Sequence, residues 1–547
     1  MEGHIQKTDE ESKTKGSVDE EHETLPTLED WKTLPRVADK IPMMAWMVVI
    51  CELCERFTYY GASGPFQNYV QYPPPAVKFG QAGAIGAGQE TATALIYFFQ
   101  FFCYITPLIG AIVADQYFGR YNTILLFCVI YMVGLTVLTA TATPMAIAAK
   151  AAFPGLIVSM IIIGLGTGGI KSNVSPLVAD QYTRTKPYVK STGDKKVIVD
   201  PKITIQSLFH WFYLAINVGS LSPILTTYIE KYHSFWLAFL IPLGMFFGAI
   251  AVLVIFKNRY IKTPPQGSIL LKSFRVLKMA FIRGKKLDNV KPSNLSNEDI
   301  SKYNVNWDDK FINQVKKTLK ACKVFVFFPV YWVCYGQMNS NLVSQASVMQ
   351  TGNVPNDLIM NLNPISLIIL VPFTDNVIYP TLRRIGITVR PITRMFIGFM
   401  LASLAMAYTA IIQHVIYTTG PCFDNTGCEI DGQVVPNNVN VWIQSPSYVL
   451  IGFSEVFASV TGLSYAYERA PDEMKSTVMA IFLTMSAFGS ALGFAFVPLS
   501  KDPHLVVLYI ILSVIVAVAG FLLLFTLKRF DNEEQQEEEE QVDKSEK

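Results

Sequence analysis

The chain has 547 residues, of which 51% are hydrophobic and only 16% are charged, and this composition is hard to fit into a water-soluble globule. Together with a mean hydropathy of +0.32, it favours a membrane protein. The formal net charge of +2 points to no class of partner, because acidic ends offset a basic middle.

The first 42 residues are polar, and residues 9–23 form an acidic, low-complexity stretch. This composition predicts a solvated, disordered segment. No basic stretch followed by an apolar core opens the chain, so we expect no cleavable signal peptide. The first apolar helix should then act as an uncleaved signal.

About twelve apolar windows follow, each near the length of roughly 20 residues that a spanning helix needs. They lie near 43–71, 90–115, 120–141, 153–180, 204–228, 235–257, 322–350, 363–383, 391–417, 440–468, 474–498 and 504–528. The pattern predicts an all-α polytopic membrane protein.

A polar stretch between the sixth and seventh windows divides the chain into two halves of six helices. We place a disordered N-terminus at 1–42, one bundle at 43–257, a linker at 258–321, a second bundle at 322–528 and an acidic, disordered tail at 529–547. The linker pieces "LLKSFRVLKMAFI" and "WDDKFINQVKKTLKAC" have apolar residues at helical spacing. They fit either amphipathic helices on the membrane surface or a disordered linker with chance periodicity.

The distribution of Lys and Arg between the loops sets the expected orientation. These residues concentrate in the loops on the side of the termini and the linker, and the opposite loops hold few. Because the cytoplasmic side collects such residues, both termini are expected to be cytoplasmic. Cys422 and Cys428 then share one outer loop, where the spacing permits a disulfide without requiring it.

The first window contains the stretch "ELCERFTYYG", with Glu52, Glu55 and Arg56 on one helix face. Each charge near the bilayer centre costs roughly 2.5 to 3.5 kcal/mol, so a lipid-facing stripe would cost on the order of 8 to 10 kcal/mol. The stripe must face a water-filled cavity or partner charges, or else form an internal salt bridge that only fixes packing. Cys51 and Cys54 form a CxxC pattern, which is better interpreted as two small apolar fillers than as a redox or zinc site.

Two further charges, Lys171 and Glu455, lie in the fourth and tenth windows, far from the loops. Neither side chain can easily reach the interface, so an interior site contributed by both halves is the simplest geometry. Buried glutamates near Lys or Arg are candidate proton carriers.

The run "GLGTGGIKS" beside Lys171 formally matches a GxGxxG nucleotide motif. No strand precedes it, and Ile170 separates the last glycine from the lysine, so the phosphate-binding geometry is absent. Small residues that let membrane helices approach closely explain the run better.

Three stretches carry a family resemblance. "ELCERFTYYG" resembles the ExxER motif of the proton-coupled oligopeptide transporters, and "GAIVADQYFGRYNTI" and "FHWFYLAINVGSL" resemble their second- and fifth-helix signatures. The similarity extends over about 43–529, and the continuation "GASGPFQNYVQY" with the acidic tails is most similar to fungal di- and tripeptide transporters. The resemblance implies the major facilitator fold, in which two six-helix bundles rock around a central site.

The resemblance also implies roles for matching residues. Glu52, Glu55 and Arg56 stand at the proton-coupling positions, and Lys171 stands at the fourth-helix lysine that pairs with them. The positions that match the family's peptide pocket are Tyr60, Tyr104, Lys171, Asn217, Trp332, Asn363 and Glu455. Of these, Asn217, Asn363 and Glu455 match positions that bind the amino end of the peptide.

Two departures from the family pattern concern the carboxylate and the outer gate. Ser63 stands where many bacterial and animal relatives have an arginine, so the substrate carboxylate should depend more on Lys171 and Arg56. The seventh helix, "YWVCYGQMNSNLVSQ", lacks the Asp and Arg of animal relatives, so a gate there must use other groups.

These features predict a plasma-membrane symporter that takes up di- and tripeptides together with protons, with the lipid bilayer as its surroundings. No cofactor other than the proton, no metal and no nucleic acid is expected. Uptake of nitrate or another small anion is one alternative, and a peptide sensor that does not transport is another. An enzyme is not expected, because no catalytic triad, metal spacing or nucleotide loop is recognisable.

Overall fold

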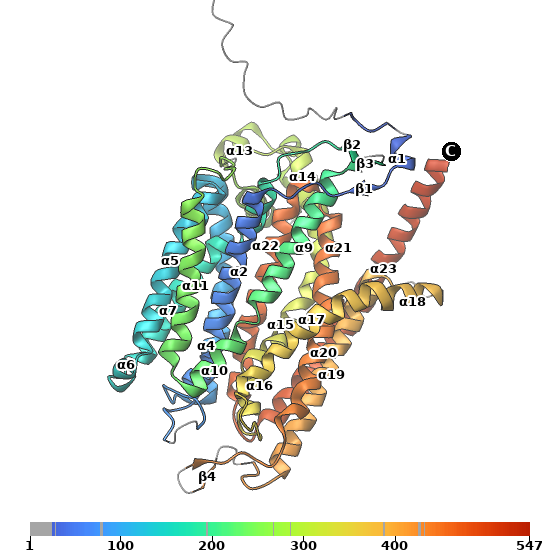
Figure 1. Cartoon of the computed structure of the whole chain (residues 1–547). Coiled ribbons are helices and arrows are strands. Elements are labelled where there is room, and N and C mark those ends of the chain that lie inside the picture. The colour runs from blue at the N-terminus through green and yellow to red at the C-terminus, as the bar shows by residue number, and fades with distance from the viewer. Residues whose placement is uncertain are drawn as a thin grey trace, which may run out of the picture.

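The computed structural model describes residues 24–546, except 28, 77–79, 193–194, 266, 285, 387–388, 425–427 and 431–432. Residues 1–23 of the segment predicted to be disordered, 1–42, lie outside the described residues, and their disorder stays a prediction. The prediction is wrong for part of 24–42, because α1 (Asp30–Thr33) and β1 (Arg36–Val37) form there and β1 pairs with a strand that precedes the fifth span. The described chain is mostly helical, and its long helices run roughly side by side (Figure 1).

The first half is built from six long helices, three of which continue past a bend into a shorter helix. They are α2 (Met43–Ser63) with α3 (Phe66–Gln71), α4 (Gly88–Val113), α5 (Arg120–Thr141), α7 (Ala152–Lys171) with α8 (Val174–Asp180), α9 (Pro201–Gly219) with α10 (Pro223–Tyr232), and α11 (Phe235–Ile255).

The second half repeats this plan with more interruptions. It consists of α15 (Phe328–Gly336) with α16 (Asn341–Ser347), α17 (Leu362–Phe373) with α18 (Tyr379–Arg384), α19 (Pro391–Thr418), α20 (Ser445–Glu455) with α21 (Thr461–Arg469), α22 (Lys475–Gly493) and α23 (Leu505–Glu546).

The helices have the dimensions of membrane spans. Within the described residues, 11 helical stretches are long and apolar enough to cross a membrane. Helix α2 has 21 residues but carries the three charges of the ExxER motif, which lower its apolar character. Because a helix of that length covers about 30 Å, we count it as a further span. The predicted all-α polytopic fold is confirmed.

Each half has its own hydrophobic core. One continuous cluster of buried side chains extends from Ala45 to Tyr260, and another from Cys322 to Leu527. The halves meet along a smaller surface, where α22 packs against α4. Two separately packed bundles with a limited contact between them are an arrangement that permits rigid-body rocking.

The glycine run of α7 packs this helix closely against its neighbours. A Cβ added to Gly166 would lie 2.6 Å from Tyr131 Cβ on α5, and one added to Gly168 would lie 2.6 Å from Thr106 Cβ on α4. Thr106 also donates a hydrogen bond of 2.7 Å to the Gly164 carbonyl. The interpretation of this run as a helix-packing surface is confirmed.

The two ends of the bundles differ, and we name them by what they carry (Figure 1). The linker side carries α1 (Asp30–Thr33), the linker helices and a sheet of β1 (Arg36–Val37), β2 (Tyr188–Thr192) and β3 (Lys195–Val199). The disulfide side carries α6 (Pro144–Ala148), the Cys422–Cys428 disulfide and the hairpin of β4 (Glu429–Ile430) and β5 (Gln433–Val434).

The sheet on the linker side was not predicted from the sequence. Strands β2 and β3 form an antiparallel hairpin with Tyr188 opposite Val199, and β1 adds in parallel with Arg36 opposite Ile198. The order β1-β3-β2 therefore attaches the chain preceding α2 to the loop that precedes α9.

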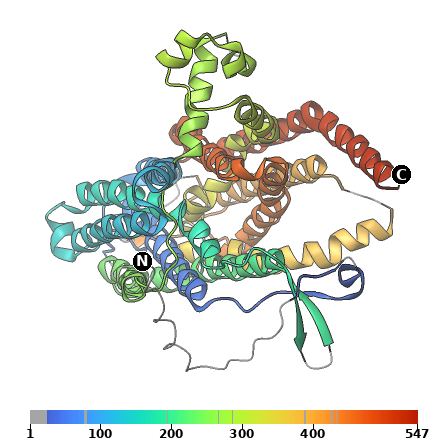
Figure 2. The same ribbon diagram turned by 90° about the horizontal axis from the view of Figure 1, so that it is seen from above.

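The linker is helical, with α12 (Ile269–Ile282), α13 (Asn297–Lys302) and α14 (Asp309–Ala321). Buried faces of α12 and α14 pack on each other and on Met474. Phe274 and Phe281 on α12 are 64% and 69% exposed. Figure 2 shows the linker helices projecting from the side of the two bundles.

The acidic tail differs from expectation. The sequence predicts a disordered segment at 529–547, whereas α23 continues without interruption to Glu546. The tail is rich in Glu and Gln, which are good helix formers, and the preceding span supplies a nucleated helix to extend.

Candidate functional site

The polar stripe of α2 is a buried cluster of three charges. Arg56 lies between two carboxylates, with its Nε 3.0 Å from Glu52 Oε1 and an Nη 2.6 Å from Glu55 Oε2. All three residues are at most 5% exposed. Two carboxylates share one guanidinium, so the fully ionised cluster would hold one buried negative charge that an internal salt bridge does not balance.

Lys171 approaches this cluster without joining it. Its ammonium lies 3.6 Å from the centre of the Tyr104 ring, a cation–π contact between α7 and α4. Its charge acts on both Glu52 and Glu55. Within the described residues, however, only Arg56 forms ion pairs with these glutamates. The direct pairing that the resemblance implies for Lys171 is not present in this conformation.

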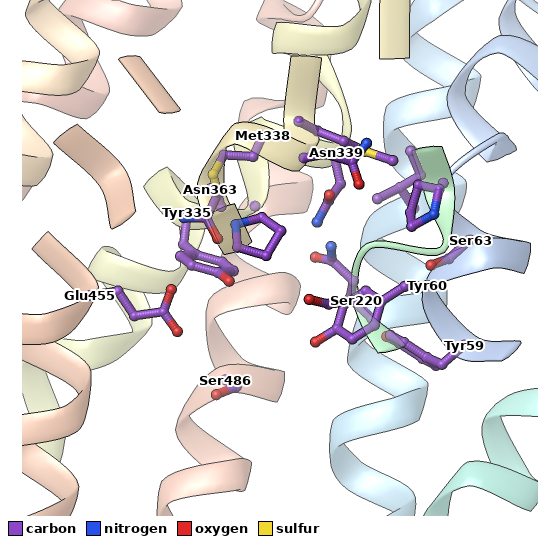
Figure 3. Close-up of a pocket in the computed structure, with 18 of the residues that line it drawn as sticks. Tyr59, Tyr60, Ser63, Ser220, Tyr335, Met338, Asn339, Asn363, Glu455 and Ser486 are labelled. Carbon is purple, nitrogen blue, oxygen red and sulfur yellow. The ribbon is translucent and has the colours of Figure 1, made fainter. Parts of the chain in front are cut away.

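A cavity lies between the two halves, and helices of both line it (Figure 3). Six of the predicted peptide-binding residues line it, namely Tyr60, Tyr104, Asn217, Trp332, Asn363 and Glu455. Lys171 is the predicted residue that does not. The site expected from both halves is therefore brought together by the fold, with Lys171 behind the Tyr104 ring.

The wall from the second half carries the acid. Glu455 is the last residue of α20, before the π-helical turn Val456–Val460, and it faces the cavity beside Tyr335 and Asn363. Within the described residues, Glu455 Oε2 and Asn363 Nδ2 are buried without a hydrogen-bond partner. The same is true of Trp332 Nε1 in this wall. These unsatisfied polar atoms are positions in the cavity where a ligand or an ordered water can complete the hydrogen bonding.

The wall from the first half is aromatic and neutral. Tyr59 and Tyr60 make an edge-to-face contact with ring centres 5.2 Å apart, and both line the cavity. The Asn217 amide donates 2.8 Å to the Tyr213 carbonyl, which fixes its orientation. Ser63 also lines the cavity, so the position without an arginine offers a hydroxyl.

The sequence analysis missed several lining residues. Tyr335 follows Trp332 by three positions and therefore lies on the same face of α15. Ser486 and Ser490, spaced by four on α22, likewise share a face that lines the cavity. This helical spacing was the available signal, but such residues in an apolar span are more often ordinary packing.

Hydrogen bonds between the halves close the cavity toward the disulfide side. Gln67 on α3 donates 2.8 Å to Ser344 on α16, and Gln89 on α4 donates 3.0 Å to Asn341. Tyr72 and Ser347 make a further contact of 2.5 Å. The seventh span therefore contributes neutral amides and hydroxyls to this closure, in agreement with the prediction that a gate there uses groups other than the Asp and Arg of animal relatives.

The disulfide side also holds the two loop cysteines. Cys422 and Cys428 are joined by a disulfide in the structure, and the Cys422 backbone N–H donates 2.9 Å to Asn437. Cys51 and Cys54 in α2 are buried free thiols. The described residues contain no group of three or more His, Cys, Asp or Glu side chains that could hold a metal ion.

Known proteins with similar sequences cover almost the whole chain. Peptide transporter PTR_B of Candidozyma auris is 47% identical over 510 residues, which cover 92% of this chain and 86% of that protein. Peptide transporter PTR2 of Saccharomyces cerevisiae is 42% identical over 508 residues, which cover 93% of this chain and 82% of that protein.

Solved structures give the same fold. The POT family transporter PepTSo matches with a TM-score of 0.71 at 22% identity, covering 90% of this chain and 99% of that one. An auto-inhibited POT family peptide transporter matches with a TM-score of 0.69 at 22% identity, covering 89% and 97%. The expected major facilitator fold with two six-helix bundles is thereby confirmed. The POT family model itself matches residues 121–513, so this chain belongs to the POT family.

Proposed function

We propose that the protein is a symporter that carries di- and tripeptides across the membrane together with protons. Its membership of the POT family supports this, as do relatives named peptide transporters that are 42% to 47% identical over most of the chain. The observation that carries the proposal is the unpartnered, buried oxygen of Glu455 in a cavity between the two halves.

The two walls of the cavity differ in charge, because Glu455 lies in the second-half wall and the first-half wall is neutral. Two cations lie behind the aromatic rings of the first-half wall. The guanidinium carbon of Arg56 is 5.7 Å from the centre of the Tyr59 ring, and the ammonium of Lys171 is 3.6 Å from that of Tyr104. A zwitterionic peptide fits such a layout, because its ammonium can pair with Glu455 while its carboxylate lies toward the wall that Arg56 and Lys171 back. Tyr60, Tyr104 and Trp332 provide walls that tolerate different side chains.

The cavity is narrow in this conformation. It offers about 180 Å³, less than the roughly 300 to 1,000 Å³ of common ligand pockets, so a peptide would enter only after the halves separate. The proposed selection for two or three residues rests on the two peptide termini more than on side chains.

The cluster of Glu52, Glu55 and Arg56 is the proposed proton carrier. With one guanidinium for two carboxylates, it can become neutral overall by binding one proton. Each charge that crosses 100 mV contributes about 2.3 kcal/mol, and each pH unit about 1.4 kcal/mol. A proton moving down such gradients can therefore drive substantial accumulation of peptide.

We further propose that the protein resides in the plasma membrane with both termini and the linker side in the cytoplasm. The excess of Lys and Arg on that side supports this orientation. The Cys422–Cys428 disulfide then faces the oxidising exterior. In this orientation, the structure is closed toward the outside.

The alternatives receive less support. Glu455 in the cavity disfavours nitrate or another small anion, because it would repel such a ligand. A sensor that binds peptide without moving it is not favoured by any contact in the described residues. Both alternatives are separated from a symporter by one transport experiment.

The experiment uses purified protein in liposomes with an imposed pH gradient, acidic outside, and a labelled dipeptide. We expect the dipeptide to accumulate inside, by up to about tenfold per pH unit for one proton per peptide. An uncoupler should abolish the accumulation. Binding without uptake would indicate a sensor, and gradient-driven uptake of labelled nitrate but not dipeptide would indicate an anion carrier.

A further inference from the structure

A second pair of acids lies outside the cavity, at the contact between the halves on the disulfide side. Glu230 lies in the last turn of α10 in the first half, and Asp357 lies in the short helix Asn356–Asn361 at the start of the eighth span. Glu230 is 5% exposed and Asp357 is 0% exposed. The two carboxyl groups lie within hydrogen-bonding reach of each other.

The neighbouring amides give this pair one hydrogen bond and have no further N–H to donate. Asn68 Nδ2 donates 2.9 Å to Glu230 Oε1 and 2.9 Å to Asn356 Oδ1. Asn356 Nδ2 donates 2.9 Å to Asn68 Oδ1 and 3.0 Å to the Val343 carbonyl. Because a side-chain amide has two N–H donors, both amides are saturated.

The carboxyl oxygens that remain are unsatisfied. Among the described residues, Glu230 Oε2 and both oxygens of Asp357 are buried without a hydrogen-bond partner. Two ionised carboxylates in contact repel each other strongly in a site that excludes water. One proton placed between them removes the repulsion and supplies the missing donor.

The charged and titratable neighbours do not remove the need for a proton between the two carboxyl groups. Lys231, the next residue of α10, is the cation whose charge reaches Asp357, but its ammonium donates 2.8 Å to the Val354 carbonyl. Tyr448 on α20 is a titratable group on which the charge of Asp357 acts, and its buried hydroxyl donates 3.5 Å to the Met338 carbonyl. One cation at a distance does not balance two carboxylates in contact.

We propose that Glu230 and Asp357 form a second proton-binding site, which holds the two halves together on the disulfide side. The proton bridges one carboxyl group of each half, as O–H···O, next to the Asn68–Asn356 pair. Opening of this side separates the acids, exposes them to water and releases the proton. The proposal deepens the symporter function and rests on it. It states that a proton is bound at this site when the disulfide side is closed and is released when that side opens.

The expected pH dependence follows from this geometry. The closed state binds the shared proton and the open state does not, so lower pH favours closure and higher pH favours opening. For one linked proton, the ratio of closed to open molecules changes by up to about tenfold per pH unit.

The test measures the separation of the halves without peptide. Met145 on α6 and Trp442 at the start of the tenth span are 86% and 51% exposed on the disulfide side, one in each half. Spin labels on Met145→Cys and Trp442→Cys report the closed fraction between about pH 5 and pH 8. A sample without the added cysteines reports any labelling of the buried native thiols.

Two near-isosteric variants replace the proton. In Glu230→Gln or Asp357→Asn, the new amide can donate to the remaining carboxylate, so the closed state should persist to high pH. In these variants the ratio of closed to open molecules should change less steeply with pH than in the wild type, because one linked proton is lost. If Asp357→Asn does not fold, Glu230→Gln alone decides the question.

The matched control is Asp502→Asn. Asp502 is an acid on the same side, its pKa is raised by burial to about 6, and Tyr417 donates 2.5 Å to it within the second half. This variant should keep the wild-type pH dependence. A wild-type closed fraction that does not respond to pH, an unchanged response in Glu230→Gln, or a response lost in Asp502→Asn would overturn the proposal. Because no peptide is present, these outcomes are independent of whether the protein transports peptides.

Discussion

The buried acids of the two halves differ in what neutralises them. In the first half, Glu52 and Glu55 contact Arg56 at 3.0 and 2.6 Å, so the protein supplies the counter-charge. In the second half, Glu455 keeps one oxygen without a partner among the described residues, in the wall of a cavity. An acid cluster that is neutralised internally, save for one charge, suits the exchange of a proton, whereas an acid left unpaired in a cavity suits a cationic ligand.

The largest expected effect comes from removing the internal partner. Arg56→Ala leaves two buried carboxylates without their cation, and breaking a buried pair typically costs about 3 to 5 kcal/mol. We expect a lowered temperature of unfolding in detergent and loss of driven uptake. Arg56→Lys should retain part of the stability, because it keeps the charge. Unchanged unfolding of Arg56→Ala would contradict the internal pairing.

The next effect concerns the unpaired acid. Glu455→Ala should weaken binding of a free dipeptide, because its ammonium loses its counter-charge at a cost of roughly 2 to 5 kcal/mol, or about 30-fold or more in affinity. Calorimetric titration measures this loss. The fold should be preserved, since Glu455 has no internal ion pair in the described residues, and a thermal unfolding scan serves as the control.

A smaller free energy is lost when the first-half cluster can no longer bind and release a proton. Glu52→Gln and Glu55→Gln keep the shape of the side chain but cannot release a proton. We expect both to lose accumulation driven by a pH gradient, worth about 1.4 kcal/mol per pH unit, and to retain some peptide exchange. Full gradient-driven accumulation in both variants would refute the coupling role.

The smallest effect is expected at Ser63. Its hydroxyl lines the cavity where many relatives have an arginine, and a neutral hydrogen bond contributes about 1 kcal/mol. Ser63→Ala should therefore change dipeptide affinity by no more than about fivefold. A much larger loss would mean that Ser63 recognises the carboxylate directly, and the roles given to Lys171 and Arg56 would need revision.

The sequence predicts the spans well because each requires a long apolar window, and it locates Glu52, Lys171 and Glu455 in the interior because lipid exposure is too costly. It does not predict which partner a buried side chain finds. Lys171 is one example, since only the packing of α7 against α4 places its ammonium on the Tyr104 ring. A pattern of spacing cannot distinguish this contact from an ion pair with Glu52.

Other features depend on contacts between distant parts of the chain. Tyr335 resembles ordinary packing in an apolar helix until the cavity is seen. Glu230 and Asp357 lie near loops in the sequence, where acids are common, and only the closed interface buries them together. The strand β1 forms because a hairpin edge is available nearby, which local composition does not reveal.

The comparison between the two halves is tested most directly by measuring two ligands on two proteins. A free dipeptide and its N-acetylated form are titrated against the native protein and against Glu455→Ala. We predict that acetylation weakens binding to the native protein by about 30-fold or more and has little effect on the variant, because the ammonium and Glu455 act as a pair. Equal losses for both ligands on mutation would contradict recognition of the ammonium by Glu455.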